Sequence, residues 1–284
     1  MRVHRVIAVV LLLSCNAHHD HAPPVEPAGL ELVSPGLPPL APLRYALAKG
    51  ATATLALDVD SKIIAGDQSN AAPPLHVALD IAVDDVLPDG RMKLTSTIRS
   101  MSATGDDPTS AHVDAIGSDL GGLAITATLS PDGTIGDVHA TDQPLPDLAK
   151  AELAQLIGGF QQLAMPLPVV PIGVGAKWRT SRPVGPAVAL ALQTTTTVEV
   201  TGHTGSTLTY AIVSELHGAD QTAVQDGVSV DVKSITGMAN ATGTIDLARF
   251  AVDTTQSAEL HMEMTTGSDR TPMTMTQTLR VSSH

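Results

Sequence analysis

Apolar and polar residues alternate with a period of two along much of this chain. Between residues 75 and 83 every second residue is Leu, Val or Ile, and His76 and Asp80 lie between them. Residues 53–59 repeat the pattern. Because successive side chains of a β-strand point to opposite faces, each such segment buries one face and leaves the other in water. The pattern predicts antiparallel strands with one solvated face.

Turn signals separate these segments. The tripeptide Pro-Asp-Gly occurs at residues 88–90 and 131–133, each time between two alternating runs. Pro presets the backbone and Gly accepts a positive φ, so both copies predict a hairpin turn. In the C-terminal part we expect strands at 188–200, 208–213, 228–232, 242–252, 258–264 and 273–281.

One segment departs from the alternation. Residues 146–164 begin with Pro-Asp, which suits the first turn of a helix. Their apolar residues Leu153, Ile157 and Phe160 recur at helical spacing. The sequence therefore predicts a mainly β fold in which a large curved antiparallel sheet, or half-barrel, wraps one amphipathic α-helix. These three residues are candidates for lining an apolar ligand site between the sheet and the helix.

The N-terminus has the features of an export signal. Arg2 and Arg5 precede an apolar run, Val6 to Leu13. Eight residues are too few to span a bilayer, which requires about 20 apolar residues. We therefore predict that residues 1–14 are a signal peptide that is removed from the mature protein.

The residues at the end of this run are Leu12-Leu13-Ser14-Cys15, and they resemble the lipobox of bacterial lipoproteins. The resemblance implies that Cys15 is lipidated and anchors the protein to a membrane. In such lipoproteins an Asp directly after the cysteine favours retention at the inner membrane. This chain has Asn16 there, so we expect the protein to be anchored in the outer membrane. The alternative is a conventional signal peptide cleaved near Ala17 or Ala22.

The rest of the chain divides into a tether and one domain. Residues 15–42 carry seven prolines and no sustained periodicity, which predicts a Pro-rich linker after the lipidated cysteine. Residues 43–284 then form a single β-rich domain. A weak internal twofold repeat is indicated by two pairs of matching motifs, Arg44-Tyr45 with Lys177-Trp178 and Gly133-Thr134-Ile135 with Gly243-Thr244-Ile245.

Composition excludes several classes of partner. The net charge is −13, with only 16 Lys and Arg residues, which argues against binding to nucleic acid. A single cysteine excludes an intramolecular disulfide and Cys-based zinc sites. One Trp, two Tyr and two Phe provide few stacking surfaces for sugars or bases, whereas aliphatic walls suffice for a lipid-like ligand.

Two groups of residues raise the question of metal binding. His18-His19-Asp20-His21 lies in the tether, where a polar spacer and weak metal capture are the two interpretations. Soft thioether sulfurs suit copper(I). The four methionines near the C-terminus instead continue apolar stripes, which predicts core packing or the lining of an apolar ligand site. These methionines are Met262, Met264, Met273 and Met275. We predict no metal site and no cofactor.

The sequence contains no HExxH, GxSxG or GxxxxGK[ST] motif, and we predict no catalytic residues. Residues 43–50 and 171–178 resemble an uncharacterised β-rich lipoprotein family of Gram-negative envelopes. The leading hypothesis is a non-enzymatic, outer-membrane-anchored lipoprotein that holds an apolar or lipid-like ligand. The alternatives are a structural protein that docks another envelope protein, and an envelope hydrolase.

Overall fold

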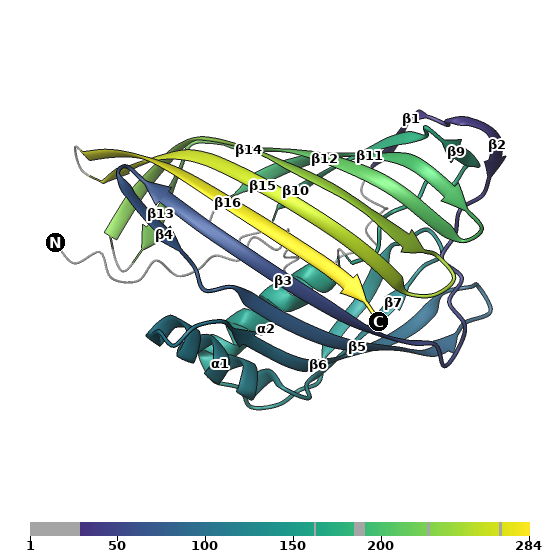
Figure 1. Ribbon diagram of the computed structural model, residues 1–284, viewed down its shortest axis with the longest axis horizontal. Helices are drawn as coiled ribbons and strands as arrows, with labels where there is room; N and C mark the ends of the chain where they lie inside the picture. The colour runs from purple at the N-terminus through teal and green to yellow at the C-terminus, as the bar shows by residue number, and fades with distance from the viewer. Residues whose placement is uncertain (1–28, 162, 185–190, 226–227, 267–268) are drawn as a thin grey trace.

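The computed structural model describes residues 29–161, 163–184, 191–225, 228–266 and 269–284. In these residues a 14-stranded antiparallel sheet dominates the fold; it is strongly curved and does not close (Figure 1). Two helices accompany it, α1 (Pro108–Leu120) and α2 (Asp147–Phe160). The mainly β prediction is therefore confirmed, with two helices where the sequence indicated one.

The two edges of the sheet are β1, near the N-terminus, and β8, which comes from the middle of the sequence. It runs β1 (Leu30–Ser34), β10 (Lys177–Val184), β11 (Leu192–Thr204), β12 (Thr207–Gly218), β14 (Val228–Asp246), β15 (Ala251–Thr266), β16 (Asp269–Ser283), β3 (Thr52–Ala65), β5 (Leu75–Val86), β6 (Met92–Ala103), β7 (Ala124–Leu129), β8 (Ile135–Ala140). Off this path, β13 (Gln221–Gln225) pairs with β14 and β4 (Gln68–Ala71) with β3, while β2 (Leu37–Ala41) and β9 (Ile172–Val174) form a separate small sheet.

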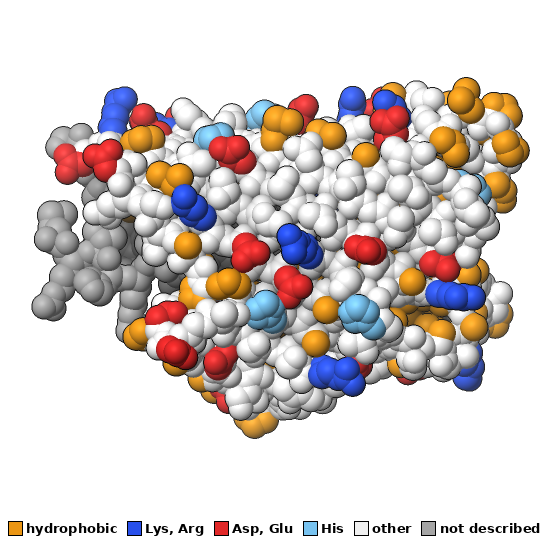
Figure 2. Space-filling model, viewed as in Figure 1, with side chains coloured by type: hydrophobic (Ala, Val, Ile, Leu, Met, Phe, Trp, Pro, Cys, Tyr) orange, Lys and Arg blue, Asp and Glu red, His pale blue; other side chains and the backbone are white. Residues whose placement is uncertain are grey.

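The alternation of the sequence produces the two faces of this sheet. On β3, Leu55, Leu57 and Val59 are buried, whereas Asp58 faces outward and pairs with His76 of β5. The buried face is the concave one, on which both helices pack. Charged and histidine side chains are scattered over the outer surface (Figure 2).

Both Pro-Asp-Gly turns are confirmed. One joins β5 to β6 and the other joins β7 to β8, with φ of 84° at Gly90 and 86° at Gly133. Gly133 has a second constraint, because a Cβ atom there would collide with the carbonyl of Met165. The second turn therefore packs tightly against the chain that follows α2.

The helix expected at 146–164 is α2, and it ends earlier, at Phe160. Sequence reasoning missed α1. Asp107 caps this helix by accepting hydrogen bonds from the backbone nitrogens of Thr109 and Ser110, and Pro108 follows in the first turn. Its buried face contains Ser110 and Gly117, so it lacks the continuous stripe of large apolar residues by which an amphipathic helix is recognised.

The prediction of a Pro-rich tether to residue 42 is wrong for its second half. Leu30 to Ser34 pair with β10, and Leu37 pairs with Val174 of β9. Leu30 and Leu32 pack partly buried against the core, and β1 takes the outer edge of the sheet, where no second partner strand is needed. Residues 15–28 of the expected tether, the signal peptide and Cys15 lie outside the described residues, as does the start of the strand expected at 188–200.

Three clusters of buried side chains fill the concave side. The first surrounds Trp178 and Tyr45, the second lies between α2 and β3 to β7, and the third contains Met262 and Met275. The matching motifs of the expected twofold repeat do not occupy equivalent positions, since Gly133 lies in a turn and Gly243 lies inside β14.

Candidate functional site

A cavity of about 230 Å³ lies between the concave face of the sheet, the end of α2 and the chain that follows it. Strands from both halves of the sequence supply its walls. Its lining residues include Leu57, Leu79, Leu156, Phe160, Met165, Trp178, Arg182, Thr194, Tyr210, Ala241, Gln256 and Leu279.

One side of the cavity is aliphatic. Leu57 of β3, Leu79 of β5 and Leu279 of β16 point inward from the sheet. Leu156 and Phe160 of α2 oppose them and are buried in the same cluster. This side has no hydrogen-bonding side chain among these residues, so it suits a hydrocarbon group.

The opposite side, formed by β10 to β12, carries polar side chains among apolar ones such as Trp178 and Val198. Thr196 and Ser214 face each other across β11 and β12, with 2.9 Å between their hydroxyl oxygens. Arg182 and Thr194 are register partners on β10 and β11. The cavity therefore has one aliphatic side and one side that carries polar groups, which we call its polar side, and Arg182 is the one charged side chain among the described residues that line it.

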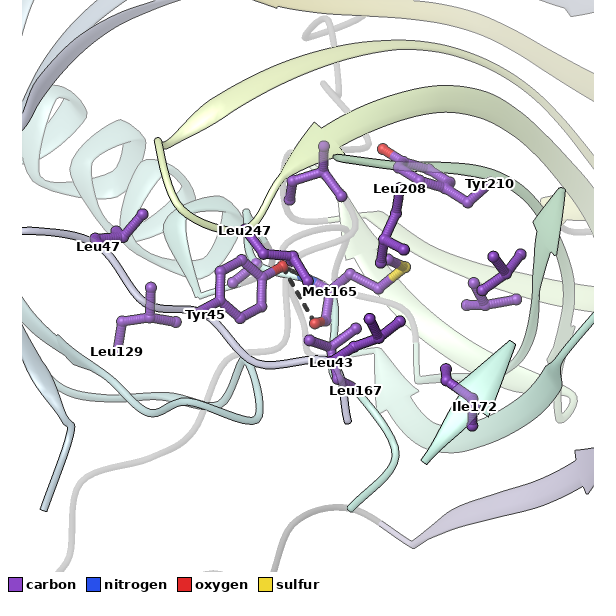
Figure 3. Close-up of a cluster of buried hydrophobic side chains, with 14 of the residues drawn as sticks. Leu43, Tyr45, Leu47, Leu129, Met165, Leu167, Ile172, Leu208, Tyr210 and Leu247 are labelled. Carbon is purple, nitrogen blue, oxygen red and sulfur yellow. Dashed lines mark hydrogen bonds between the residues drawn. The ribbon is translucent and has the colours of Figure 1, made fainter. Parts of the chain in front are cut away.

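The chain after α2 forms one wall of the cavity and is held by a buried tyrosine. The hydroxyl of Tyr45 accepts a hydrogen bond from the backbone nitrogen of Met165 at 2.9 Å and lies 3.3 Å from its carbonyl oxygen (Figure 3). Burial raises the pKa of Tyr45 far above its usual range, so the phenol stays neutral. Arg44 adds hydrogen bonds to the carbonyl oxygens of Pro168 and Val169.

The sequence-predicted lining residues fall in different places. Phe160 lines the cavity. Leu153 and Ile157 are half-buried against the second cluster and do not line the cavity. The four methionines lie in or against the third cluster, where Met262 is the register partner of Met273, and none of them lines this cavity.

Sequence reasoning missed the polar side of the cavity. Thr180, Arg182, Thr194, Thr196 and Ser214 are ordinary polar residues within strands, and the polar phase of an alternating strand normally faces water. On β10 to β12 some of these positions share the inward face with Trp178. The sequence did contain a signal for Arg182. It lies four residues after Trp178 on β10, and residues an even number of positions apart point to the same face of a strand.

Histidines with hydrogen-bonded acids occur on the outer face. His76 lies 2.6 Å from Asp58 through Nδ1 and 2.9 Å from the Thr104 hydroxyl through Nε2. The order acid, histidine, hydroxyl resembles that of a hydrolase triad. These side chains are about half exposed or more, and none of them lines the cavity.

Exposed apolar side chains gather at the end of the molecule that carries β2 and β9 (Figures 1 and 2). Leu37 is 70% exposed and Val169 is 75% exposed. We call this group the β2–β9 patch; it consists of Val33, Leu37, Leu40, Val169, Val170 and Val174.

Within the described residues, no group of three or more His, Cys, Asp or Glu side chains is arranged to hold a metal ion. The His18-His19-Asp20-His21 motif lies outside those residues. Neither described helix is long and apolar enough to cross a membrane.

No protein-family model matches the chain, and no curated protein sequence matches it.

Proposed function

We propose that this protein is a non-enzymatic lipoprotein, anchored to the outer membrane through Cys15, that holds an apolar or lipid-like ligand in its interior cavity. The observation that carries the proposal is the cavity of about 230 Å³ between the sheet and α2, with one aliphatic side.

A hydrocarbon chain is the group that such walls favour. Each methylene buried on leaving water contributes about 0.8 kcal/mol. The aliphatic side gives water no hydrogen-bond partner, so water against that side is easily displaced. The scarcity of aromatic residues matters little, because contact with a hydrocarbon chain needs no stacking surface.

Trp178 provides a direct test of cavity occupancy. It is the chain's single Trp, it is fully buried, and it lines the cavity. Hexadecanol with bromine atoms in its chain should quench Trp178 fluorescence when it enters, whereas unbrominated hexadecanol should compete and restore the signal. Protein purified from its own envelope should also carry a bound lipid in native mass spectrometry. Absence of quenching together with empty native spectra would overturn the proposal.

A second function, docking of another envelope protein, is favoured by the β2–β9 patch. Exposed apolar residues that gather in one place often mark an interaction surface. Val169 is 75% exposed and its backbone is held in place by Arg44, so the surface is presented by a fixed segment. Crosslinking in intact cells through position 169 should capture one dominant partner; diffuse products would contradict docking at this patch.

A further inference from the structure

We infer that the cavity takes a single-chain amphiphile with an anionic head group, and that Arg182 binds this head group. The inference rests on the proposed function and names the chemical class of its ligand. It starts from a charged side chain in the cavity wall that has no counterion among the described residues.

Arg182 lacks a counterion. Its side chain is half-buried, and it forms no hydrogen bond or ion pair with any described residue. No nitrogen of Arg182 is among the buried side-chain atoms that lack a partner, so the guanidinium keeps contact with solvent and is open to a ligand in the cavity. A carboxylate or phosphate replaces that hydration well, since the planar guanidinium donates two parallel hydrogen bonds to either group.

Two other side chains on this side of the cavity also have unused hydrogen-bonding capacity. Thr194, its register partner, is 4% exposed, and its Oγ1 has no partner among the described residues. Trp178, four residues before Arg182 on the same face of β10, is fully buried, and its Nε1 also has no partner there. Buried polar atoms are rarely left unpaired, and a polar group of a ligand that lies at Arg182 would give the Thr194 hydroxyl a partner.

The position of Arg182 sets the orientation of the ligand. β1 covers β10 from Lys177 to Thr180, so Arg182 lies beyond the pairs of this edge strand. The aliphatic wall, formed by Leu57, Leu79 and Leu156, lies on the other side of the cavity. The head group therefore lies at the β10 edge and the hydrocarbon chain runs toward α2 and β5.

The size of the cavity favours a ligand with one chain. About 230 Å³ is smaller than the roughly 300–1,000 Å³ of most small-molecule pockets. The volume therefore favours one hydrocarbon chain over two, with part of the ligand reaching the open side of the cavity. Carboxylate and phosphate head groups share the chemistry that Arg182 recognises, and a direct comparison separates them.

The test measures the affinities of palmitate, hexadecyl phosphate and hexadecanol for the delipidated protein by calorimetry. Arg182→Gln should weaken binding of at least one anionic ligand by about tenfold or more, as for hydrogen bonds to charged groups, and leave hexadecanol unchanged. Whichever anion binds more tightly identifies the head group. Arg179→Gln is the matched control, because Arg179 lies on the outer face of the same strand.

The two possible failures are distinguishable. If all three ligands bind equally to the wild type and to Arg182→Gln, the head-group inference is wrong and the cavity remains a site for an apolar ligand. The same holds if Arg179→Gln weakens binding as much as Arg182→Gln. If none of the three ligands binds, the proposed function itself is wrong.

Discussion

The hydroxyl oxygen of Tyr45 lies 2.9 Å from the backbone nitrogen of Met165 and 3.3 Å from its carbonyl oxygen, so one side chain satisfies both polar groups of a residue 120 positions away. Tyr45 and Met165 are both buried. This contact fixes the chain after α2 over the cavity, since Leu163, Ala164 and Met165 belong to the cavity wall.

Tyr45→Phe should lower the free energy of unfolding by about 1–3 kcal/mol, because it leaves a buried N–H and a buried carbonyl without a partner. Chemical denaturation followed by circular dichroism measures the change. Tyr210→Phe is the control, since its hydroxyl bonds to the side chain of Thr254, a half-buried hydroxyl that is free to rotate once the phenol is removed. An equal loss of unfolding free energy in both variants would show that the hydrogen bonds to Met165 do not stabilise the protein more than the hydroxyl of Tyr210 does.

Gly117→Ala should destabilise the protein by about 1–3 kcal/mol, as overpacking does. Gly117 lies on the buried face of α1, and a Cβ atom there would collide with the carbonyl of Met101 on β6. Gly136→Ala on β8 is the control, because its Cβ would meet nothing within 4 Å. Thermal unfolding of both variants checks the prediction; a tolerated alanine at 117 would mean that α1 does not pack this closely on β6.

Glu152→Gln should stabilise the protein at neutral pH. Burial raises the pKa of Glu152 above its ordinary value of 4.5, while His112 of α1 opposes the shift. The folded state therefore holds this proton more tightly than the unfolded chain, and stability falls as pH rises from the ordinary value through the folded-state pKa. The gain in Tm from the variant should be present at about pH 7 and disappear below about pH 4.

Asp119→Asn on the exposed side of α1 removes the same charge and is the control for Glu152→Gln. Thermal unfolding at several pH values compares the two variants. A pH-independent gain at position 152, or the same gain at position 119, would contradict the role of burial.

Ala241→Phe should block ligand binding while preserving the fold. Ala241 is a small residue on the inward face of β14 in the cavity wall, so a benzyl group there fills ligand space. Displacing about two methylene groups of the ligand, at about 0.8 kcal/mol each, weakens binding by about tenfold or more. Thr242→Phe points outward on the same strand and should leave affinity unchanged. Unaltered quenching of Trp178 by brominated hexadecanol in Ala241→Phe would place the ligand elsewhere.

Cys15→Ser should release the protein from the membrane fraction into the soluble fraction. The acidic body, with a net charge of −13 in the full chain, gains nothing from an anionic membrane surface, so acyl chains must supply the attachment. Fractionation and detergent partitioning measure the change. Unchanged partitioning would refute lipidation and favour the conventional signal peptide cleaved near Ala17 or Ala22.

The alternation of residues such as Leu75, Val77 and Leu79 was sufficient to predict the sheet, because one-sided burial imposes a period of two on any strand. The Pro-Asp-Gly turns and α2 were predictable for similarly local reasons. α1 was missed, because its close contact with β6 depends on Gly117, and a small residue gives no hydrophobic signal in the sequence. The strands in residues 30–41 were missed because their proline content is also typical of linkers.

The sequence alone determined which residues alternate, where the hairpins turn and that one segment forms an amphipathic helix, since each depends on neighbours within a few positions. Only the tertiary structure decided which parts of the strands surround a cavity. Curvature and strand order bring Arg182, Leu279 and Leu57 to one cavity, from β10, β16 and β3. The tertiary structure also placed the predicted methionines in a separate cluster. Alternation along a strand determines only that a side chain points inward, whereas its position along the strand determines which cluster it joins.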